Sequence, residues 1–250
     1  MSSQTAKRVA VVLGLGKGTG TGASTARLFA KSGYEVALIS RGGDHLENLG
    51  KDIKSNGGNA KTFPLASYSH EDVINAWAAV HKAFPKPEYV VRVAVFNGGW
   101  GAFKKFLDVT PEDVQTALQA SVAAAFSFAR GAILAFKDND IDESNGKRGA
   151  LIFTGATAST RGNVITSCFA AGKHGLRALS QSLGKEFGKE NIHVAHSIID
   201  GAVLFDTTWK TTDRVGLTPD SIAASYLYLV NQDKSAWTWE LDLRPAHEKW

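Results

Sequence analysis

The chain has 250 residues, of which 44% are hydrophobic, so it can bury one large core, and we expect a single α/β domain over residues 1–250. Its one cysteine, Cys168, excludes an intrachain disulfide framework and favours a cytoplasmic location. The net charge of +4 comes from scattered basic residues, which argues against nucleic-acid binding. We expect no signal segment, no apolar stretch long enough to span a membrane, and no metal site.

Short runs rich in β-branched residues alternate along the chain with longer segments of helical period. The predicted strands are residues 8–14, 35–40, 60–64, 89–96, 149–154, 192–199 and 238–243. The predicted helices include residues 21–33, 70–83, 111–135, 167–188 and 219–230. This alternation predicts a parallel sheet with helices on both faces, in which ligands bind beyond the carboxyl ends of the strands.

A glycine-rich segment, G-L-G-K-G-T-G-T-G, follows the first predicted strand. Glycines at a strand-to-helix turn let the backbone approach a pyrophosphate, and the helix N-terminus that follows favours negative charge. The spacing G-x-x-x-G-x-G fits twice, beginning at Gly14 or at Gly16. A flexible turn without a ligand is the alternative, but the strand-turn-helix context favours nucleotide binding.

Four segments carry a resemblance to a known family. The run G-T-G-A-S-T-A-R-L-F-A-K-S-G-Y-E-V-A-L-I-S-R covers residues 20–41, F-N-G-G covers 96–99, F-x-x-x-K covers 169–173 and D-G-A-V covers 200–203. In this order they resemble the landmarks of the short-chain dehydrogenase/reductase family along nearly the full chain. The resemblance implies a single Rossmann-like, doubly wound parallel sheet with helices on both faces, and it selects the glycine register that begins at Gly16. The cofactor-binding residues that it implies are Gly16, Thr19, Gly20, Thr21, Gly22, Asn97, Gly98, Lys173 and Val203.

The end of the second predicted strand indicates which nicotinamide cofactor the chain prefers. An acidic residue there would hydrogen-bond the ribose hydroxyls of NAD, whereas this chain has Ser40 and Arg41, a hydroxyl and a cation suited to a 2′-phosphate. We therefore expect NADP(H), with a surface role for Arg41 as the alternative. The family's acidic residue near the adenine is missing after the third strand, where Ala66 and Ser67 stand, and Ser67 is the expected contact.

The resemblance fails at three catalytic positions. In the family a tyrosine donates a proton to the substrate carbonyl, a lysine lowers the pKa of that tyrosine and holds the cofactor ribose, a serine orients the substrate, and an asparagine supports a proton relay. Here Phe169 replaces the tyrosine, Ala156 the serine and Ser121 the asparagine, and only Lys173 remains. We expect Lys173 to bind the cofactor ribose; the alternative is an exposed helix lysine beside a core phenylalanine.

Asp200 is the expected substitute acid. It replaces the family's proline at a turn facing the nicotinamide, where burial would raise the pKa of its carboxyl group. A turn-forming Asp-Gly dipeptide is the alternative. The expected catalytic residues are thus Lys173 and Asp200.

The expected substrate contacts are Trp100, Ala156, Phe169 and Trp209. Trp209 falls in the segment 204–217, where the family folds a mobile loop over its substrate, and Trp100 would close the opposite side. For both tryptophans the alternative is a core or interface position.

The function that these observations predict is an atypical NADP(H)-dependent oxidoreductase for a small apolar or aromatic substrate. Without the tyrosine, an imine, an iminium ion or a conjugated acceptor suits the site better than a simple ketone, because its reduction needs no proton at oxygen. The alternatives are a non-redox isomerase or cyclase on the same scaffold, and a cofactor-binding protein without catalysis. The family resemblance also implies a homodimer or homotetramer.

Overall fold

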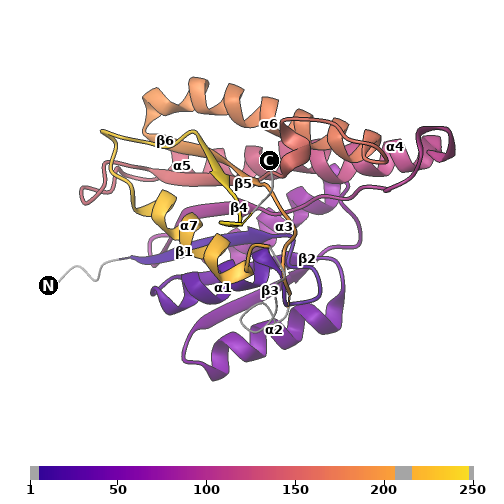
Figure 1. Ribbon diagram of the computed structural model, residues 1–250. Coiled ribbons are helices and arrows are strands. Elements are labelled where there is room, and N and C mark those ends of the chain that lie inside the picture. Colours follow the sequence, from indigo (N-terminus) through magenta and orange to yellow (C-terminus); the bar gives the residue numbers. More distant parts are fainter. Residues whose placement is uncertain (1–5, 206–215, 248–250) are drawn as a thin grey trace, which may run out of the picture.

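The computed structural model describes residues 6–205 and 216–247, and its helices and strands alternate along the chain (Figure 1). The strands are β1 (Lys7–Leu13), β2 (Glu35–Ser40), β3 (Asn59–Pro64), β4 (Tyr89–Phe96), β5 (Gly149–Thr154), β6 (Ile192–Ile199) and β7 (Glu240–Leu243). The α-helices are α1 (Thr21–Lys31), α2 (Gly43–Ser55), α3 (His70–Ala83), α4 (Pro111–Leu118), α5 (Ala124–Lys137), α6 (Ser167–Phe187) and α7 (Pro219–Asn231).

All seven strands form one parallel sheet in the order β3-β2-β1-β4-β5-β6-β7. The chain order reverses between β1 and β4, and this is the point where ligands bind in open parallel sheets. The predicted fold, a doubly wound parallel sheet with helices on both faces, is therefore confirmed.

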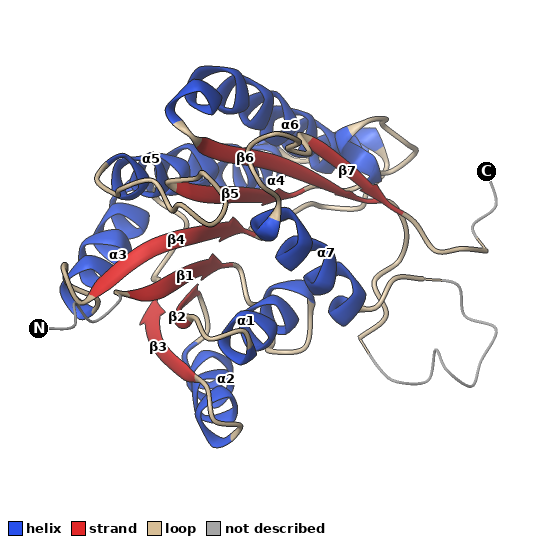
Figure 2. Cartoon of the chain, turned by 90° about the vertical axis from the view of Figure 1, so that its left-hand side faces the viewer, coloured by secondary structure: helices blue, strands red, loops and turns tan. Residues whose placement is uncertain are grey.

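The two faces of the sheet bury separate apolar cores. Along β1, Val9, Val11 and Leu13 pack on one face, whereas Ala10 and Val12 pack on the other, because successive side chains of a strand alternate. The first core includes residues of α3, α5 and α6, and the second includes residues of α1, α2 and α7. The two helical layers can be followed on either side of the strands in Figure 2.

Helix α2 is not among the predicted helices. Leu46, Leu49 and Ile53 are buried along it at helical spacing and pack on the second core. Glycine is a poor helix former, and the helix both starts at Gly43 and contains Gly50, which weakens the local signal.

The predicted helix 111–135 is interrupted by a π-helical turn, Gln119–Ala123, between α4 and α5. Thr110 and Asp113 form a capping box at its start, and Pro111 takes the first helical position. Single π turns within α-helices occur frequently at functional sites. Ser121 lies in this turn, fully buried.

The same helical stretch corrects the expectation that no apolar segment is long enough for a membrane. Residues Pro111–Lys137 form 27 consecutive helical residues whose most apolar window has a mean hydropathy of 1.4. However, 61% of that window is buried inside the protein, as in the core helices of other sheet proteins. Its apolar character is explained by its packing on the sheet.

Candidate active site

A cavity of about 710 Å³ opens where the sheet reverses its order, beyond the carboxyl ends of the central strands. Its residues come from the glycine-rich loop, from the segments that follow β4, β5 and β6, and from helix α6. They are Leu15, Gly16, Gly20, Thr21, Gly22, Asn97, Gly98, Gly99, Trp100, Gly101, Phe103, Thr154, Gly155, Ala156, Thr157, Ala158, Arg161, Asn163, Thr166, Phe169, Lys173, Ile199, Gly201, Val203 and Phe205.

The glycine-rich loop is held by a contact from the neighbouring strand. Gly20 caps helix α1, and the Asn97 side-chain amide donates a hydrogen bond to the Gly14 carbonyl at 2.6 Å. A Cβ atom at Gly22 would lie 2.3 Å from the same carbonyl oxygen, so only glycine fits there. Gly16, in contrast, has φ +56°, and no heavy atom of the described residues lies within 4 Å of its Cβ position, which leaves room for a ligand.

Most of the predicted cofactor residues line one of two neighbouring cavities. Gly16, Gly20, Thr21, Gly22, Asn97, Gly98, Lys173 and Val203 line the main cavity, whereas Thr19 does not. Arg41 and Ser67 line a second cavity of about 910 Å³ beside it, and Trp100 lines both. Ser40 is buried and lines neither cavity.

Arg41 lies against an aromatic ring that the sequence did not indicate. Its guanidinium carbon is 4.5 Å from the centre of the Tyr68 ring, a cation–π distance. Tyr68 packs partly on the core, and its backbone carbonyl accepts a hydrogen bond from Gln119 at 2.6 Å. The ring is therefore a fixed platform for the guanidinium group at the edge of the second cavity.

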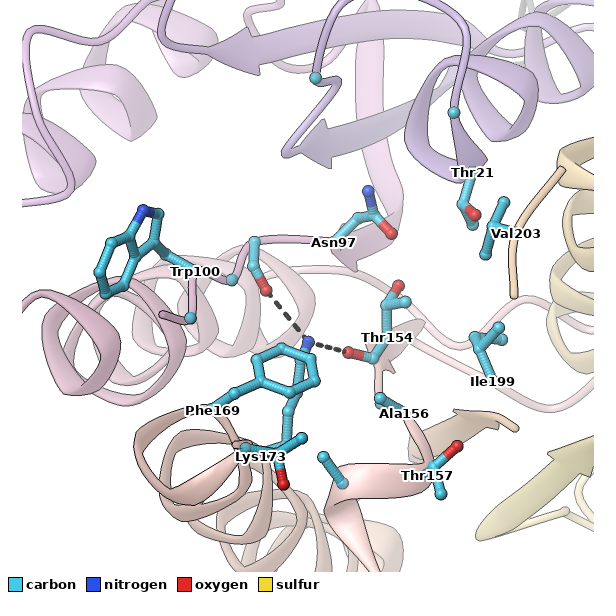
Figure 3. A pocket seen from close by; sticks show the side chains of 18 of the residues that line it. Thr21, Asn97, Trp100, Thr154, Ala156, Thr157, Phe169, Lys173, Ile199 and Val203 are labelled. Carbon is cyan, nitrogen blue, oxygen red and sulfur yellow. Dashed lines mark hydrogen bonds between the residues drawn. The ribbon is translucent and has the colours of Figure 1, made fainter. Parts of the chain in front are cut away.

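Lys173 is buried, with 5% of its surface exposed, and its ammonium group contacts two backbone carbonyls (Figure 3). It donates hydrogen bonds to the Thr154 carbonyl at 2.8 Å and to the Gly98 carbonyl at 3.4 Å. Burial lowers the pKa of Lys173 to about 8. The alternative of an exposed helix lysine is wrong, because the ammonium group lies inside the cavity between β4 and β5.

Phe169 occupies the place next to this lysine. A Cβ atom at Gly101 would lie 2.5 Å from the Phe169 side chain, so the phenyl ring packs closely on the backbone there. The ring centre is 5.3 Å from that of Phe103. Both rings line the cavity together with Trp100. Ala156 presents a methyl group to the same cavity (Figure 3).

Ser121, which stands where the family resemblance expects the relay asparagine, does not line the cavity. Its hydroxyl oxygen is buried and has no hydrogen-bond partner among the described residues. A Cβ atom at Gly172 would lie 3.0 Å from that oxygen, so helix α6 packs directly on the π turn.

Asp200 does not occupy the place that the sequence predicts for it. It is 1% exposed and does not line the cavity, although the residues on both sides of it do. Its carboxylate pairs with Arg161 at 3.2 Å and with Arg244 at 2.7 Å, and it accepts a hydrogen bond from the Thr157 hydroxyl at 2.5 Å. Its carboxylate group therefore faces two guanidinium groups and a hydroxyl group rather than the cavity.

No tyrosine among the described residues lines the cavity. All five tyrosines of the chain are among those residues. Tyr226 contacts a residue that lines the cavity, since its hydroxyl lies 2.8 Å from the Thr154 hydroxyl. However, Tyr226 is fully buried, and burial raises the pKa of its phenol well above the ordinary value.

Several cavity residues were missed by the sequence analysis. Arg161 and Asn163 come from the segment between β5 and α6, and Phe103 lies at the exposed side of the cavity. The only local signal was the R-G-N run in a predicted loop, which is equally common on ordinary surfaces. Trp209, like most of the expected lid segment 204–217, lies outside the described residues.

Comparison with known proteins agrees with this architecture. The sequence model of the short chain dehydrogenase family matches residues 8–215. The chain is 24% identical over 224 residues to a 3-oxoacyl-(acyl-carrier-protein) reductase of Chlamydia muridarum, covering 84% of this chain and 85% of that protein. It is 25% identical over 241 residues to an uncharacterized oxidoreductase of Staphylococcus aureus, covering 96% of this chain and 97% of that protein.

Solved structures are similar along almost the whole chain. A short-chain dehydrogenase from Rhodopseudomonas palustris has 30% identity and a TM-score of 0.78, covering 96% of this chain and 98% of that one. An alcohol dehydrogenase from Thermococcus sibiricus, complexed with 5-hydroxy-NADP, has 22% identity and a TM-score of 0.82, covering 98% and 99%, and this likeness shows the fold. The family match over residues 8–215, together with the sheet order and the glycine-rich loop, shows that the chain belongs to the short-chain dehydrogenase family.

Proposed function

We propose that this protein is an NADP(H)-dependent oxidoreductase that reduces conjugated acceptors or imines rather than simple ketones. The observation that carries the proposal is the combination around Lys173. The buried lysine is retained at the cavity, whereas the two neighbouring positions that would supply protons to a carbonyl oxygen hold Phe169 and Ala156. The site thus keeps the residue that suits cofactor binding and lacks the residues that suit acid catalysis.

The residues present fit NADP(H). The open Cβ position at Gly16, the N-terminus of α1 and the Lys173 ammonium group suit the pyrophosphate and the nicotinamide ribose. Arg41 on the Tyr68 ring suits a 2′-phosphate. The Thermococcus sibiricus relative was solved with 5-hydroxy-NADP and a metagenomic relative with NADP. When bound, NADPH supplies a hydride.

The need for a proton donor differs between the possible hydride acceptors and decides which of them suits the site. Hydride addition to a ketone leaves an alkoxide, which requires a proton donor, and the Thr157 hydroxyl is already donating to Asp200. Hydride addition at the β-carbon of a conjugated acceptor leaves an enolate, whose negative charge Lys173 can stabilise while solvent protonates the α-carbon. An iminium ion takes hydride without any proton, but two cations, Lys173 and Arg161, line the cavity. The cavity charge therefore favours the conjugated acceptor over the iminium ion.

The substrate wall is apolar. Trp100 and Phe169 lie on one side of the cavity, and Ile199 and Val203 lie across it (Figure 3). Phe103 also lines the cavity. These side chains suit a small aromatic or aliphatic body.

A panel of simple ketones, cyclic imines and aryl enones, incubated with NADPH and followed by both cofactor absorbance and product mass, tests the proposal. We expect enone or imine reduction with matching cofactor oxidation, and slow or absent ketone reduction. Product without a net change in cofactor would instead indicate an isomerase or cyclase. NADPH binding without any product would indicate a binding protein.

We also propose a cytoplasmic homodimer or homotetramer. The single cysteine carries the proposed location. A groove of about 610 Å³ lies between α5 and α6, and Phe126 and Leu134 beside it are 57% and 54% exposed. Exposed large apolar residues gathered at one groove mark interaction surfaces, and closed symmetric assembly is the usual way in which identical chains cover them.

A further inference from the structure

The charged side chains described at the main cavity are all positive. Among the described residues that line it, Lys173 and Arg161 are cationic and none is acidic. Lys173 is buried and hydrogen-bonded to two carbonyl oxygens. Arg161 lies at the open side, with 53% of its side chain exposed. The cavity thus offers one accessible, permanently charged group outside the region that suits the cofactor.

One nitrogen atom of the Arg161 guanidinium group is held by Asp200. Its Nη2 atom lies 3.2 Å and 3.4 Å from the two carboxylate oxygens of Asp200. Asp200 also pairs with Arg244 and accepts a hydrogen bond from Thr157, so its charge is divided among several donors. The Nε and Nη1 atoms of Arg161 make no hydrogen bond to the described residues. The guanidinium group is therefore oriented by Asp200 and still has donors available for a ligand.

One neutral donor lies beside it in the same loop, and Thr166 holds the turn that carries it. The Thr166 hydroxyl accepts a hydrogen bond from the Asn163 amide at 2.9 Å and donates one to the Asn163 carbonyl at 2.9 Å. The Asn163 side-chain oxygen accepts from the Val164 amide at 2.8 Å, which leaves its NH₂ group as a donor. Asn163 and Thr166 line the cavity together with Arg161.

The wall near this loop is aromatic. Phe103 is 60% exposed and lies 5.3 Å, ring centre to ring centre, from Phe169, and both line the cavity. A ligand bound in this cavity can therefore contact both Arg161 and the aromatic rings. One accessible guanidinium group matches the single charge of a carboxylate, and its Nε and Nη1 atoms can each donate a hydrogen bond to a carboxylate oxygen.

We propose that the substrate carries a carboxylate group, which Arg161 binds, on an apolar or aromatic body that packs against Phe103 and Phe169. That the bound carboxylate is a substrate rests on the proposed function, but its binding to Arg161 does not require turnover. Arg161 is then a specificity-determining residue, and the substrate class narrows to carboxylate-bearing conjugated acceptors.

The experiment measures binding without turnover. Protein saturated with NADP⁺ is titrated calorimetrically with 4-oxo-4-phenylbutanoate and with its neutral amide, 4-oxo-4-phenylbutanamide. We expect the wild-type protein to bind the acid more tightly than the amide. Arg161→Gln should weaken binding of the acid by roughly ten- to hundredfold and leave that of the amide nearly unchanged. Arg161→Lys should retain part of the preference, since it keeps the charge and loses the planar fork.

Controls separate this effect from misfolding and from net charge. Arg130→Gln, which makes the same charge change on the α5 groove, should bind both ligands as the wild type does. The affinity for NADP⁺ should be equal in all variants. Equal binding of acid and amide by the wild type, or an equal loss of both in Arg161→Gln, would overturn the proposal.

A second measurement distinguishes this inference from the proposed function. The enone 4-oxo-4-phenylbut-2-enoate and its amide are compared as substrates with NADPH. Acid binding that depends on Arg161 without reduction of either compound would overturn the proposed function and keep the carboxylate site. Equal reduction of both compounds, unchanged in Arg161→Gln, would keep the function and overturn the carboxylate site.

Discussion

The ammonium nitrogen of Lys173 lies 5.9 Å from the centre of the Phe169 ring and makes its short hydrogen bond elsewhere, to the Thr154 carbonyl at 2.8 Å. The lysine is thus held by backbone groups, which do not depend on the side chain at position 169. A phenol in place of the phenyl ring would stand next to a buried cation, which favours ionisation of the phenol and makes it a better acid near neutral pH.

The first prediction therefore concerns the combined variant Phe169→Tyr and Ala156→Ser. It should gain ketone reductase activity by about a hundredfold to ten-thousandfold, the usual contribution of general acid catalysis, with nearly unchanged NADPH affinity. Initial rates with a simple aryl ketone and a fluorescence titration with NADPH measure the two quantities.

Phe103→Tyr is the matched control, because it adds a phenol to the same cavity wall at a position 5.3 Å, ring to ring, from Phe169. It should give no comparable gain. If the native protein already reduces simple ketones rapidly and the double variant does not improve it, another group supplies the proton and this account of the site is wrong.

The second prediction concerns cofactor preference. NADPH should bind more tightly than NADH, and Arg41→Ala should remove most of a preference of roughly ten- to hundredfold, because a charge-assisted contact to the 2′-phosphate is lost. Tyr68→Ala should lower the preference in part by freeing the guanidinium group from its platform, whereas Tyr68→Phe should keep it. Dissociation constants for both cofactors give the ratio directly; equal values in the wild type would contradict the assignment of Arg41.

The third prediction concerns the pH dependence of stability without cofactor. Burial lowers the pKa of Lys173 to about 8, below its ordinary value of 10.5 in the unfolded chain. Between these pH values the unfolded chain binds more protons, so the free energy of unfolding rises with pH, by at most about 1.4 kcal/mol per pH unit for this group. Lys173→Met should remove that slope, as measured by urea unfolding from pH 8 to 10.5.

Lys147 is the matched control, because burial lowers its pKa to about 8 as well, its ammonium group donates to the Val230 carbonyl, and it does not line the cavity. Lys147→Met should reduce the pH slope of stability similarly without altering NADPH affinity, which Lys173→Met should weaken. A pH slope in Lys173→Met equal to that of the wild type would show that Lys173 keeps an ordinary pKa.

The fourth prediction concerns assembly. Light scattering should give the mass of a dimer or tetramer at micromolar concentration, and the double variant Phe126→Glu and Leu134→Glu should shift it toward the monomer, because charges would be buried at the α5 groove. Leu107→Glu replaces a 92% exposed residue outside this groove and should leave the mass unchanged. A monomeric wild-type protein at high micromolar concentration would contradict the proposed assembly.

Local patterns alone determined most of the fold. Buried strands of a parallel sheet appear as continuous apolar runs such as V-A-V-V-L in β1, and the glycine-rich turn follows directly from its spacing. Helix α2 was missed because its glycines weaken the local signal, although the packing of Leu46 and Ile53 on the second core stabilises it. The sequence also placed Phe169 and Ala156 where the family resemblance expects a tyrosine and a serine, since these assignments depend only on spacing along the chain.

The electrostatics of the site was decided by the tertiary structure. Asp200 was expected to be an acid, but Arg161 and Arg244, which lie in other parts of the chain, converge on its carboxylate. Likewise, Tyr68 reaches Arg41 only because β2 and β3 are adjacent in the sheet. An ion pair or a ring contact depends on distances of a few ångströms between segments that are remote in sequence, and no periodic pattern encodes those distances. The sequence therefore determined which elements form and where the cofactor loop lies, and packing decided which charges face the substrate cavity.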